Sequence, residues 1–365
     1  MILMNDFKAE PAELRDAMTV AATRVLSSGW YVLGKEVQAF EQSWAKACGT
    51  AHCIGVANGM DAIELALRSL DIGPGDEVIT TPMTAFATVL AIVRAGAIPV
   101  LADIELDSGL LSPASVKRCL SPRTRAVVLV HLYGQIRDMD IWVDLCREAG
   151  IELVEDCAQS HLARWNDRPA GSFGIAGAYS FYPTKNLGAI GDGGALVTQS
   201  AALALRVSQL RNYGQSERYV HPELGMNSRL DEIQAALLTE RLRWLDRFTE
   251  RRRAIAQSYD AGIDNARVTV LARPQQAHSH VHHLYVVLCD VRDALSKHLA
   301  ESGVQTLIHY PVPAHRQAPC AALQRDPLGL QHAEAHAASC LSIPCHPQMS
   351  DADIAQVVDA LNAFR

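Results

Sequence analysis

The chain has 365 residues, which is enough for one large domain and a smaller second one. Hydrophobic residues make up 49% of it and charged residues 20%, the composition of an ordinary globular enzyme. The net charge of −7 argues against a nucleic-acid-binding protein, which would usually carry a basic patch. No apolar run approaches the roughly 20 residues that span a bilayer, so we expect no membrane segment.

The first part of the chain alternates between two patterns. Apolar residues at helical spacing predict helices over residues 11–28, 35–47, 63–70, 84–95, 138–149 and 200–211. Short apolar runs predict strands over residues 52–56, 77–80, 98–101, 126–130, 151–154 and 195–198. This alternation predicts an α/β domain whose largely parallel sheet is covered on both faces. Ligands of such sheets lie beyond the carboxyl ends of strands, where Asn58-Gly59-Met60 and Asp156 fall.

The second part of the chain has a different pattern. Residues 229–260 predict one long, bent helix that connects two domains. It contains the one dense basic run, Arg251-Arg252-Arg253, which we expect on a solvated helix face. Strands predicted over 286–288 and 304–308, with helices over 292–302 and 350–364, indicate a smaller α+β domain. We therefore place a large domain at residues 1–240 and a small C-terminal domain, with its connecting helix, at residues 241–365.

Cysteine usage and the first residues bear on the compartment. Nine cysteines without a CxxC pair indicate reduced, partly buried thiols. Polar residues soon after Met1, among them Asn5, Asp6 and Lys8, do not form the apolar core of a signal peptide. We expect a cytoplasmic protein.

One lysine, Lys185, stands between an aromatic run and a glycine-dense loop, in the sequence FYPTKNLGAIGDGG over residues 181–194. A lysine becomes a nucleophile where desolvation and neighbours favour its neutral amine. The plainer interpretation is a solvated loop lysine, with Gly191, Gly193 and Gly194 at positions that need φ > 0. Asp156 upstream is equally open to two interpretations, a structural cap or an acid–base group.

A lysine and a carboxylate in one α/β domain also suit pyridoxal phosphate. The lysine can form a Schiff base with this cofactor, and the carboxylate can hold the ring nitrogen protonated so that the ring acts as an electron sink. The phosphate needs N–H groups at the start of a helix. Asn58-Gly59-Met60-Asp61 offers them, because Gly59 allows close approach. The spacing alone does not decide between this hypothesis and the plainer interpretations of Lys185 and Asp156.

Short motifs occur in order over nearly the whole chain. They are NGMDA (58–62), GPGDEVI (73–79), HLYGQ (131–135), EDCAQSH (155–161), YPTKNLG (182–188), GMNSRLDEIQAA (225–236) and IHYP (308–311). Each is moderately specific, and together they resemble the sugar aminotransferases of the DegT/DnrJ/EryC1/StrS family. The resemblance implies an aspartate-aminotransferase-like fold (fold type I of pyridoxal phosphate enzymes), pyridoxal phosphate as cofactor, and a homodimer with active sites at the subunit interface.

The resemblance also implies roles for individual residues. Lys185 is expected to be the Schiff-base lysine and general base, and Asp156 to pair with the pyridine nitrogen. The other expected cofactor contacts are Gln159 near the ring hydroxyl, Phe86 on the ring face, the N–H groups of Gly59 and Met60 and the Ser180 hydroxyl at the phosphate, and Asn227 from the other subunit. His309 and Tyr310 are expected near the sugar. Arg218 is a candidate for facing a nucleotide diphosphate, and an exposed loop arginine is the plainer interpretation.

By the same resemblance, the expected reaction is ping-pong transfer of an amino group from L-glutamate to a nucleotide-linked keto sugar. Many family members have threonine at the position of Met60, where its hydroxyl meets the phosphate. An apolar residue there resembles the branch that aminates C3 of 3-keto deoxysugar nucleotides, such as dTDP-3-keto-6-deoxyhexose. We place this acceptor ahead of a 4-keto sugar or a cyclitol.

Three other interpretations are less favoured. His278, His280 and His282, with His283 beside them, would share one face of a strand and could bind zinc, but no cysteine or carboxylate converges on them, so we expect no metal site. Relatives that dehydrate sugars carry histidine in place of Lys185. A non-catalytic regulatory relative would be expected to lose cofactor contacts, which are present here.

Overall fold

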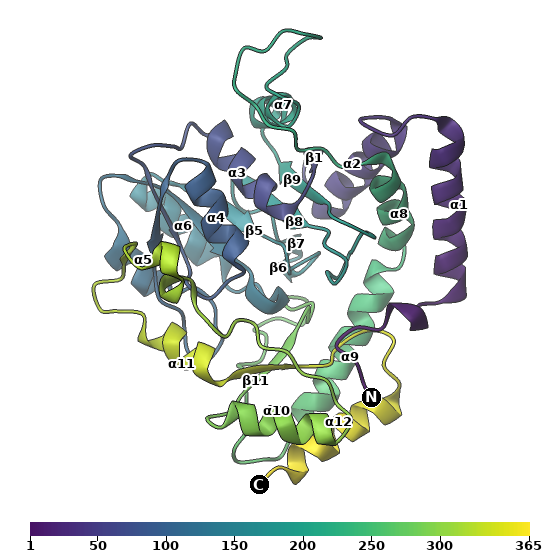
Figure 1. Ribbon diagram of the computed structural model, residues 1–365. Helices are drawn as coiled ribbons and strands as arrows, with labels where there is room; N and C mark the ends of the chain where they lie inside the picture. The colour runs from purple at the N-terminus through teal and green to yellow at the C-terminus, as the bar shows by residue number, and fades with distance from the viewer.

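A sheet of eight strands organises the computed structural model, which describes residues 1–365 (Figure 1). The strand order is β1-β9-β8-β5-β4-β2-β3-β12. β9 is antiparallel to β1 and β8, and the other pairs are parallel, so the predicted largely parallel sheet is confirmed. The strands are β1 (His52–Val56), β2 (Glu77–Thr80), β3 (Ile98–Leu101), β4 (Thr124–Val130), β5 (Glu152–Asp156), β8 (Ala176–Ser180), β9 (Gly194–Thr198) and β12 (Gln324–Arg325).

Helices cover both faces of this sheet. Successive side chains of a strand point to opposite faces, and in β4 Ala126 and Val128 pack with one set of helices while Val127 and Leu129 pack with the other. The first set is α3 (Gly59–Ser69), α4 (Phe86–Arg94) and α7 (Ala201–Leu210). The second is α2 (Lys35–Cys48), α5 (Pro113–Cys119), α6 (Met139–Ala149) and α8 (Glu232–Leu242). None of the helices combines the length and apolar character that crossing a bilayer requires.

The single helix predicted over residues 229–260 is wrong, because two helices occupy this stretch. α8 ends at Leu242 and α9 (Leu245–Gly262) begins three residues later, with neither Gly nor Pro between them. The start of α8 is fixed by Glu232, whose buried carboxylate accepts the N–H groups of Gly34, Glu36 and Val37 at 2.8, 2.9 and 3.0 Å. These donors lie at the start of α2, so α8 caps a helix nearly 200 residues upstream. α1 (Ala12–Ser28) runs beside α8 (Figure 1).

The C-terminal part has its own antiparallel sheet. β10 (Thr269–Val270), β11 (Tyr285–Leu288) and β13 (Cys340–Ile343) pair in that order and are accompanied by α10 (Arg292–Glu301), α11 (Gln331–Ser339) and α12 (Asp351–Ala363). The predicted strand over 304–308 is wrong, because Val304 and Leu307 make only isolated bridges, with Ile2 and Ser342. β12 joins the large sheet beside β3 although it comes from residues 241–365. The division of the chain at residue 240 stays a prediction.

Arg252 contradicts the expectation of a solvated basic run. Its side chain is only 5% exposed. The guanidinium donates to the carbonyls of His282 and His283 at 3.3 and 3.4 Å, and also to the carbonyl of Cys345. Burial lowers its pKa. Arg252 therefore ties α9 to two segments of the C-terminal part.

We expect Arg252→Met to lower the free energy of unfolding by about 2–4 kcal/mol, because three buried hydrogen bonds to a charged donor are lost. The neighbouring Arg251→Met is a matched control, since Arg251 bonds Asp351, a side chain that is 91% exposed. The control should lose no more than about 1 kcal/mol. Denaturant titration of both variants measures this, and equal losses would contradict the structural role of Arg252.

Candidate active site

The carboxyl edge of the large sheet brings the predicted residues together. β5 and β8 are parallel neighbours that end at Asp156 and Ser180, so both side chains lie at one edge. Lys185 lies on the loop that follows β8. Backbone hydrogen bonds close this loop, from Phe181 N to Gly193 O at 2.7 Å, from Lys185 N to Tyr182 O at 2.8 Å and from Ala189 N to Phe181 O at 2.7 Å. The loop thus holds the lysine at the edge that the sequence predicts for a ligand.

The glycines around Lys185 are needed for close approach and not for positive φ. None of Gly191, Gly193 and Gly194 has a positive φ, so that expectation is wrong. A Cβ at Gly194 would lie 2.3 Å from the carbonyl carbon of Asn58, and one at Gly188 would lie 2.3 Å from the carbonyl oxygen of Pro183. A side chain at Gly194 would therefore push this strand end away from Asn58, and one at Gly188 would push apart two parts of the loop itself.

Burial favours the neutral amine of Lys185. Burial lowers its pKa to about 8, while the nearby Asp156 carboxylate acts in the opposite direction. Burial and the charge of Lys185 lower the pKa of His161 to about 3 and that of His309 to about 4, and they also lower the pKa of His283. These three imidazoles are therefore neutral at pH 7. A lysine in this setting is available as a nucleophile close to neutral pH.

Asp156 is a buried carboxylate with its oxygens held in place. Its side chain is 6% exposed, and burial raises its pKa. Two hydrogen bonds and the charge of Lys185 act against this, since the Thr88 hydroxyl donates to Oδ2 at 2.8 Å and the Ala158 N–H donates to Oδ1 at 3.1 Å. Sequence reasoning missed Thr88, which lies 68 residues upstream in α4 and belongs to none of the motifs.

Gln159 joins the two parts of the chain. Its Oε1 accepts the N–H of Tyr133 at 2.6 Å, and its Nε2 donates to the hydroxyl of Tyr310 at 3.1 Å. Burial and the charge of Asp156 raise the pKa of Tyr310 to about 12. Nδ1 of the preceding His309 is hydrogen-bonded to Ser342 Oγ at 2.8 Å. The structure therefore brings His309 and Tyr310 to the same edge as Asp156 and Gln159.

The start of α3 offers backbone donors to an anion. α3 begins at Gly59, four residues before the predicted start, because the Asn58 side chain caps it by accepting the N–H of Asp61 at 2.8 Å. The N–H groups of Gly59 and Met60 lie in the first turn of α3, so no carbonyl of this helix can accept hydrogen bonds from them. A Cβ at Gly59 would lie 2.7 Å from Cβ of Ser180, so this helix start abuts the end of β8.

Three predicted residues make no side-chain hydrogen bond to this group. Phe86 is the first residue of α4 and is 38% exposed. Asn227 and Arg218 are exposed, on the segment after α7 that projects from the body (Figure 1). The Arg218 guanidinium lies over the ring of Tyr219, 5.0 Å from the ring centroid. No hydrogen bond within the chain links Asn227 or Arg218 to Lys185 or Asp156 through side chains.

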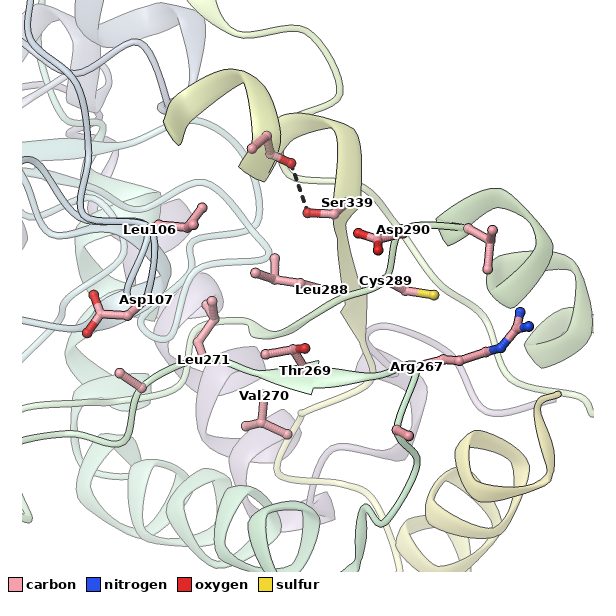
Figure 2. A pocket seen from close by; sticks show the side chains of 14 residues that line it. Leu106, Asp107, Arg267, Thr269, Val270, Leu271, Leu288, Cys289, Asp290 and Ser339 are labelled. Atoms are coloured by element: carbon pink, nitrogen blue, oxygen red, sulfur yellow. Dashed lines mark hydrogen bonds between the residues drawn. The ribbon is translucent and has the colours of Figure 1, made fainter. Parts of the chain in front are cut away.

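Two other features do not take part in this site. The histidines are not arranged around a common centre, because the rings of His280 and His282 stack 3.8 Å apart and their segment is not a strand. A pocket of about 930 Å³ beside the small sheet includes Leu106, Asp107, Arg267 and Asp290 and none of the predicted site residues (Figure 2).

Comparison with known proteins agrees with the motifs. The model of the DegT/DnrJ/EryC1/StrS aminotransferase family matches residues 13–362. The chain belongs to this family. The DegT/DnrJ/EryC1/StrS relatives include dTDP-3-amino-3,4,6-trideoxy-alpha-D-glucose transaminase of Streptomyces venezuelae, 44% identical over 360 residues, covering 98% of this chain and 95% of the relative. They also include erythromycin biosynthesis sensory transduction protein EryC1 of Saccharopolyspora erythraea, 44% identical over 358 residues and 98% of each chain.

Solved structures of DegT/DnrJ/EryC1/StrS proteins have the same fold. The crystal structure of S. venezuelae DesV in complex with a ketimine intermediate has a TM-score of 0.95 and 43% identity, covering 99% of this chain and 97% of that one. The predicted fold class is therefore confirmed.

Membership of the DegT/DnrJ/EryC1/StrS family makes this chain a sugar aminotransferase that uses pyridoxal phosphate. The residues present fit this cofactor. A lysine amine with a lowered pKa lies near a buried carboxylate, and N–H groups at a helix start lie beside Ser180. The motifs of the chain therefore contain the residue types that the cofactor needs.

Proposed function

We propose that this enzyme transfers an amino group from L-glutamate to C3 of a nucleotide-linked keto sugar, such as dTDP-3-keto-6-deoxyhexose. The observation that carries the catalytic part is the pairing of Lys185 with Asp156, each close enough for its charge to shift the pKa of the other. The lowered pKa of Lys185 suits an amine that must act without its proton.

The cofactor, when bound, supplies an electron sink that stabilises negative charge on the carbon next to the reacting nitrogen. We propose that Lys185 would hold the cofactor covalently, and that its Nζ, once free, would act as the general base that takes a proton from the substrate carbon in one half of the ping-pong cycle and gives one to it in the other. Asp156 keeps the ring nitrogen protonated, and Gln159 holds the ring hydroxyl through its Nε2. These donors and acceptors are fixed before substrate binds, which supports a preorganised site.

The remaining predicted contacts are proposals that the geometry supports to different degrees. We propose that Gly59, Met60 and Ser180 bind the phosphate, since the start of α3 abuts the end of β8. Phe86 would cover the ring face, His309 and Tyr310 would meet the sugar, and Arg218 would meet the diphosphate. The apolar Met60 favours a 3-keto acceptor, and so does the similarity to the S. venezuelae relative, a dTDP-3-amino-3,4,6-trideoxy-alpha-D-glucose transaminase.

A regulatory role is the alternative that the name of EryC1, a sensory transduction protein, suggests. The retained lysine, carboxylate and anion-binding helix start favour catalysis over a regulatory protein that only keeps the fold. The function is tested by adding L-glutamate to the holoenzyme and following its visible absorbance band. The aminated enzyme is then offered nucleotide-linked 3-keto and 4-keto sugars, with mass spectrometry of the products. A band that does not respond to any amino donor would contradict the proposal, and amination of only 4-keto sugars would contradict the C3 assignment.

We also propose a homodimer in which Asn227 completes the partner's site. Arg218 lies on the segment between α7 and α8, and Asn227 forms an isolated bridge with Asn212 at the base of this segment. Large apolar side chains are exposed on this segment and on the turn after α1, namely Tyr219 (79%), Leu224 (90%), Trp30 (63%) and Tyr31 (54%). Exposed apolar groups of this size suit burial against a second copy.

Mixed dimers test this arrangement. Neither Lys185→Ala nor Asn227→Ala alone should give a fully active homodimer. Co-expression should restore activity, because one site of the mixed dimer then combines the intact Lys185 of one chain with the intact Asn227 of the other. If Asn227 acted within its own chain, mixing would restore nothing. Sedimentation of the wild-type protein checks the dimer itself.

A further inference from the structure

A buried chain of hydroxyl groups leads to Asp156. Oγ1 of Thr88 donates to Oδ2 of Asp156 at 2.8 Å, and Oγ1 of Thr84 lies 2.8 Å from Oγ1 of Thr88. Thr84 is 6% exposed and Thr88 is 1% exposed, so water does not replace these bonds. Hydrogen bonds to a charged group are stronger than those between neutral groups, and burial strengthens them further.

The direction of this chain depends on the charge of Asp156. An ionised carboxylate only accepts hydrogen bonds, so Thr88 must give it its single hydroxyl proton. The Thr88 oxygen then has only acceptor capacity left, and Thr84 must donate to it. Both hydroxyl dipoles therefore point toward Asp156 when it is ionised. A protonated Asp156 would carry its own O–H donor, which would compete with the donation from Thr88. The arrangement as a whole favours the ionised form.

The start of α4 carries both this hydroxyl chain and Phe86, which is proposed above to cover the ring face. Phe86 is the first residue of α4, and Thr88 lies in the same turn, where its N–H bonds the carbonyl of Ala85 at 3.1 Å. A single helix start thus presents an aromatic face and the donor to Asp156. Thr84 lies just before this helix.

We propose that Thr88, supported by Thr84, is a positioning residue that keeps Asp156 ionised and correctly oriented, and so keeps the cofactor's ring nitrogen protonated. This inference rests on the role proposed for Asp156. The other titratable groups that face Asp156 are Lys185, His131, Cys157 and Tyr310. Of these, only Lys185 and His131 can bring positive charge, and neither donates a hydrogen bond to the carboxylate. The two donors to its oxygens are Thr88 and the Ala158 N–H.

The test uses Thr88→Val, which keeps the branched shape and removes the hydroxyl, with Thr88→Ser as the matched control that keeps it. The affinity of the apoprotein for pyridoxal phosphate should fall about 10- to 100-fold in Thr88→Val, as expected for a lost hydrogen bond to a charged group, and should stay within about threefold in Thr88→Ser. Equal affinities in the two variants would overturn the proposal.

A second readout follows the proton itself. With pyridoxal phosphate labelled with ¹⁵N at the ring nitrogen, NMR at pH 8 should show a protonated ring in wild type and Thr88→Ser and loss of that proton in Thr88→Val. A protonated ring in Thr88→Val would overturn the role of Thr88 while leaving the role of Asp156 intact. A protonated ring in Asp156→Asn would instead overturn the role of Asp156. If Thr88→Val does not fold, Thr84→Val replaces it in the test. We then expect a smaller loss of affinity for pyridoxal phosphate in Thr84→Val. A wild-type affinity in Thr84→Val would contradict the role of the hydroxyl chain.

Discussion

Replacing Lys185 by alanine should abolish turnover and the visible band of the lysine-bound cofactor. The loss combines the anchor with the general base, and the base alone is worth up to about 10⁴-fold. Borohydride reduction followed by peptide mapping should attach the cofactor to the peptide that contains Lys185 in wild type and to no peptide in Lys185→Ala. A variant with full transamination would refute the assignment.

The pKa of Lys185 gives this prediction a pH dependence. Below about pH 8 the amine of the apoprotein is mostly protonated and cannot attack, so the rate of covalent cofactor attachment should rise about tenfold per pH unit up to about pH 8 and then level. An ordinary lysine with a pKa of 10.5 would keep gaining rate above that pH. Lys297→Ala is the control variant, since Lys297 is 80% exposed and should be dispensable.

Asp156→Asn should lower kcat about 10²- to 10⁴-fold, the range that corresponds to breaking a buried ion pair. The stability of the apoprotein should instead increase. Because the pKa of Asp156 is raised in the folded state, the neutral carboxyl stabilises the fold at low pH, and this contribution is lost as the pH rises from the unfolded-state pKa through the raised folded-state pKa. Asparagine avoids this loss, and we expect the apoprotein of Asp156→Asn to unfold at a higher temperature than wild type at pH 7.

Kinetics and thermal unfolding of the same preparations check both parts. Asp144→Asn is a suitable control, because Asp144 is 53% exposed and should change neither activity nor stability. A loss of both activity and stability in Asp156→Asn would indicate a purely structural carboxylate.

The sequence indicates which residues lie close together at the candidate site, because they sit in motifs at strand ends. Asp156 closes β5 and Lys185 follows β8, so the parallel sheet brings them together whatever the intervening chain does. Thr88 could not be found in this way, because a buried threonine near a helix start looks like any other core residue. Its function depends on the contact between α4 and β5, which no local pattern encodes.

The errors in the fold have similar causes. Residues 304–308 include Val304, Leu307 and Ile308 and look like a short strand, but the small sheet is complete without them. Arg252 looks solvated within its run of arginines, and only the packing of α9 against the carbonyls of a distant segment buries it. The long helix over 229–260 is divided at Arg243 and Trp244, between α8 and α9, where neither glycine nor proline marks the break in the sequence.

All nine cysteines are free and buried, and burial raises the pKa of Cys48, Cys119 and Cys146 to about 12. In the folded protein these sulfurs carry almost no thiolate and are shielded from maleimides. A cysteine introduced on the projecting segment near Arg218 would therefore be the single reactive handle. Fluorescent or spin labels could be attached there without first removing any native residue, and they would report directly on whether two copies of the chain associate through this segment.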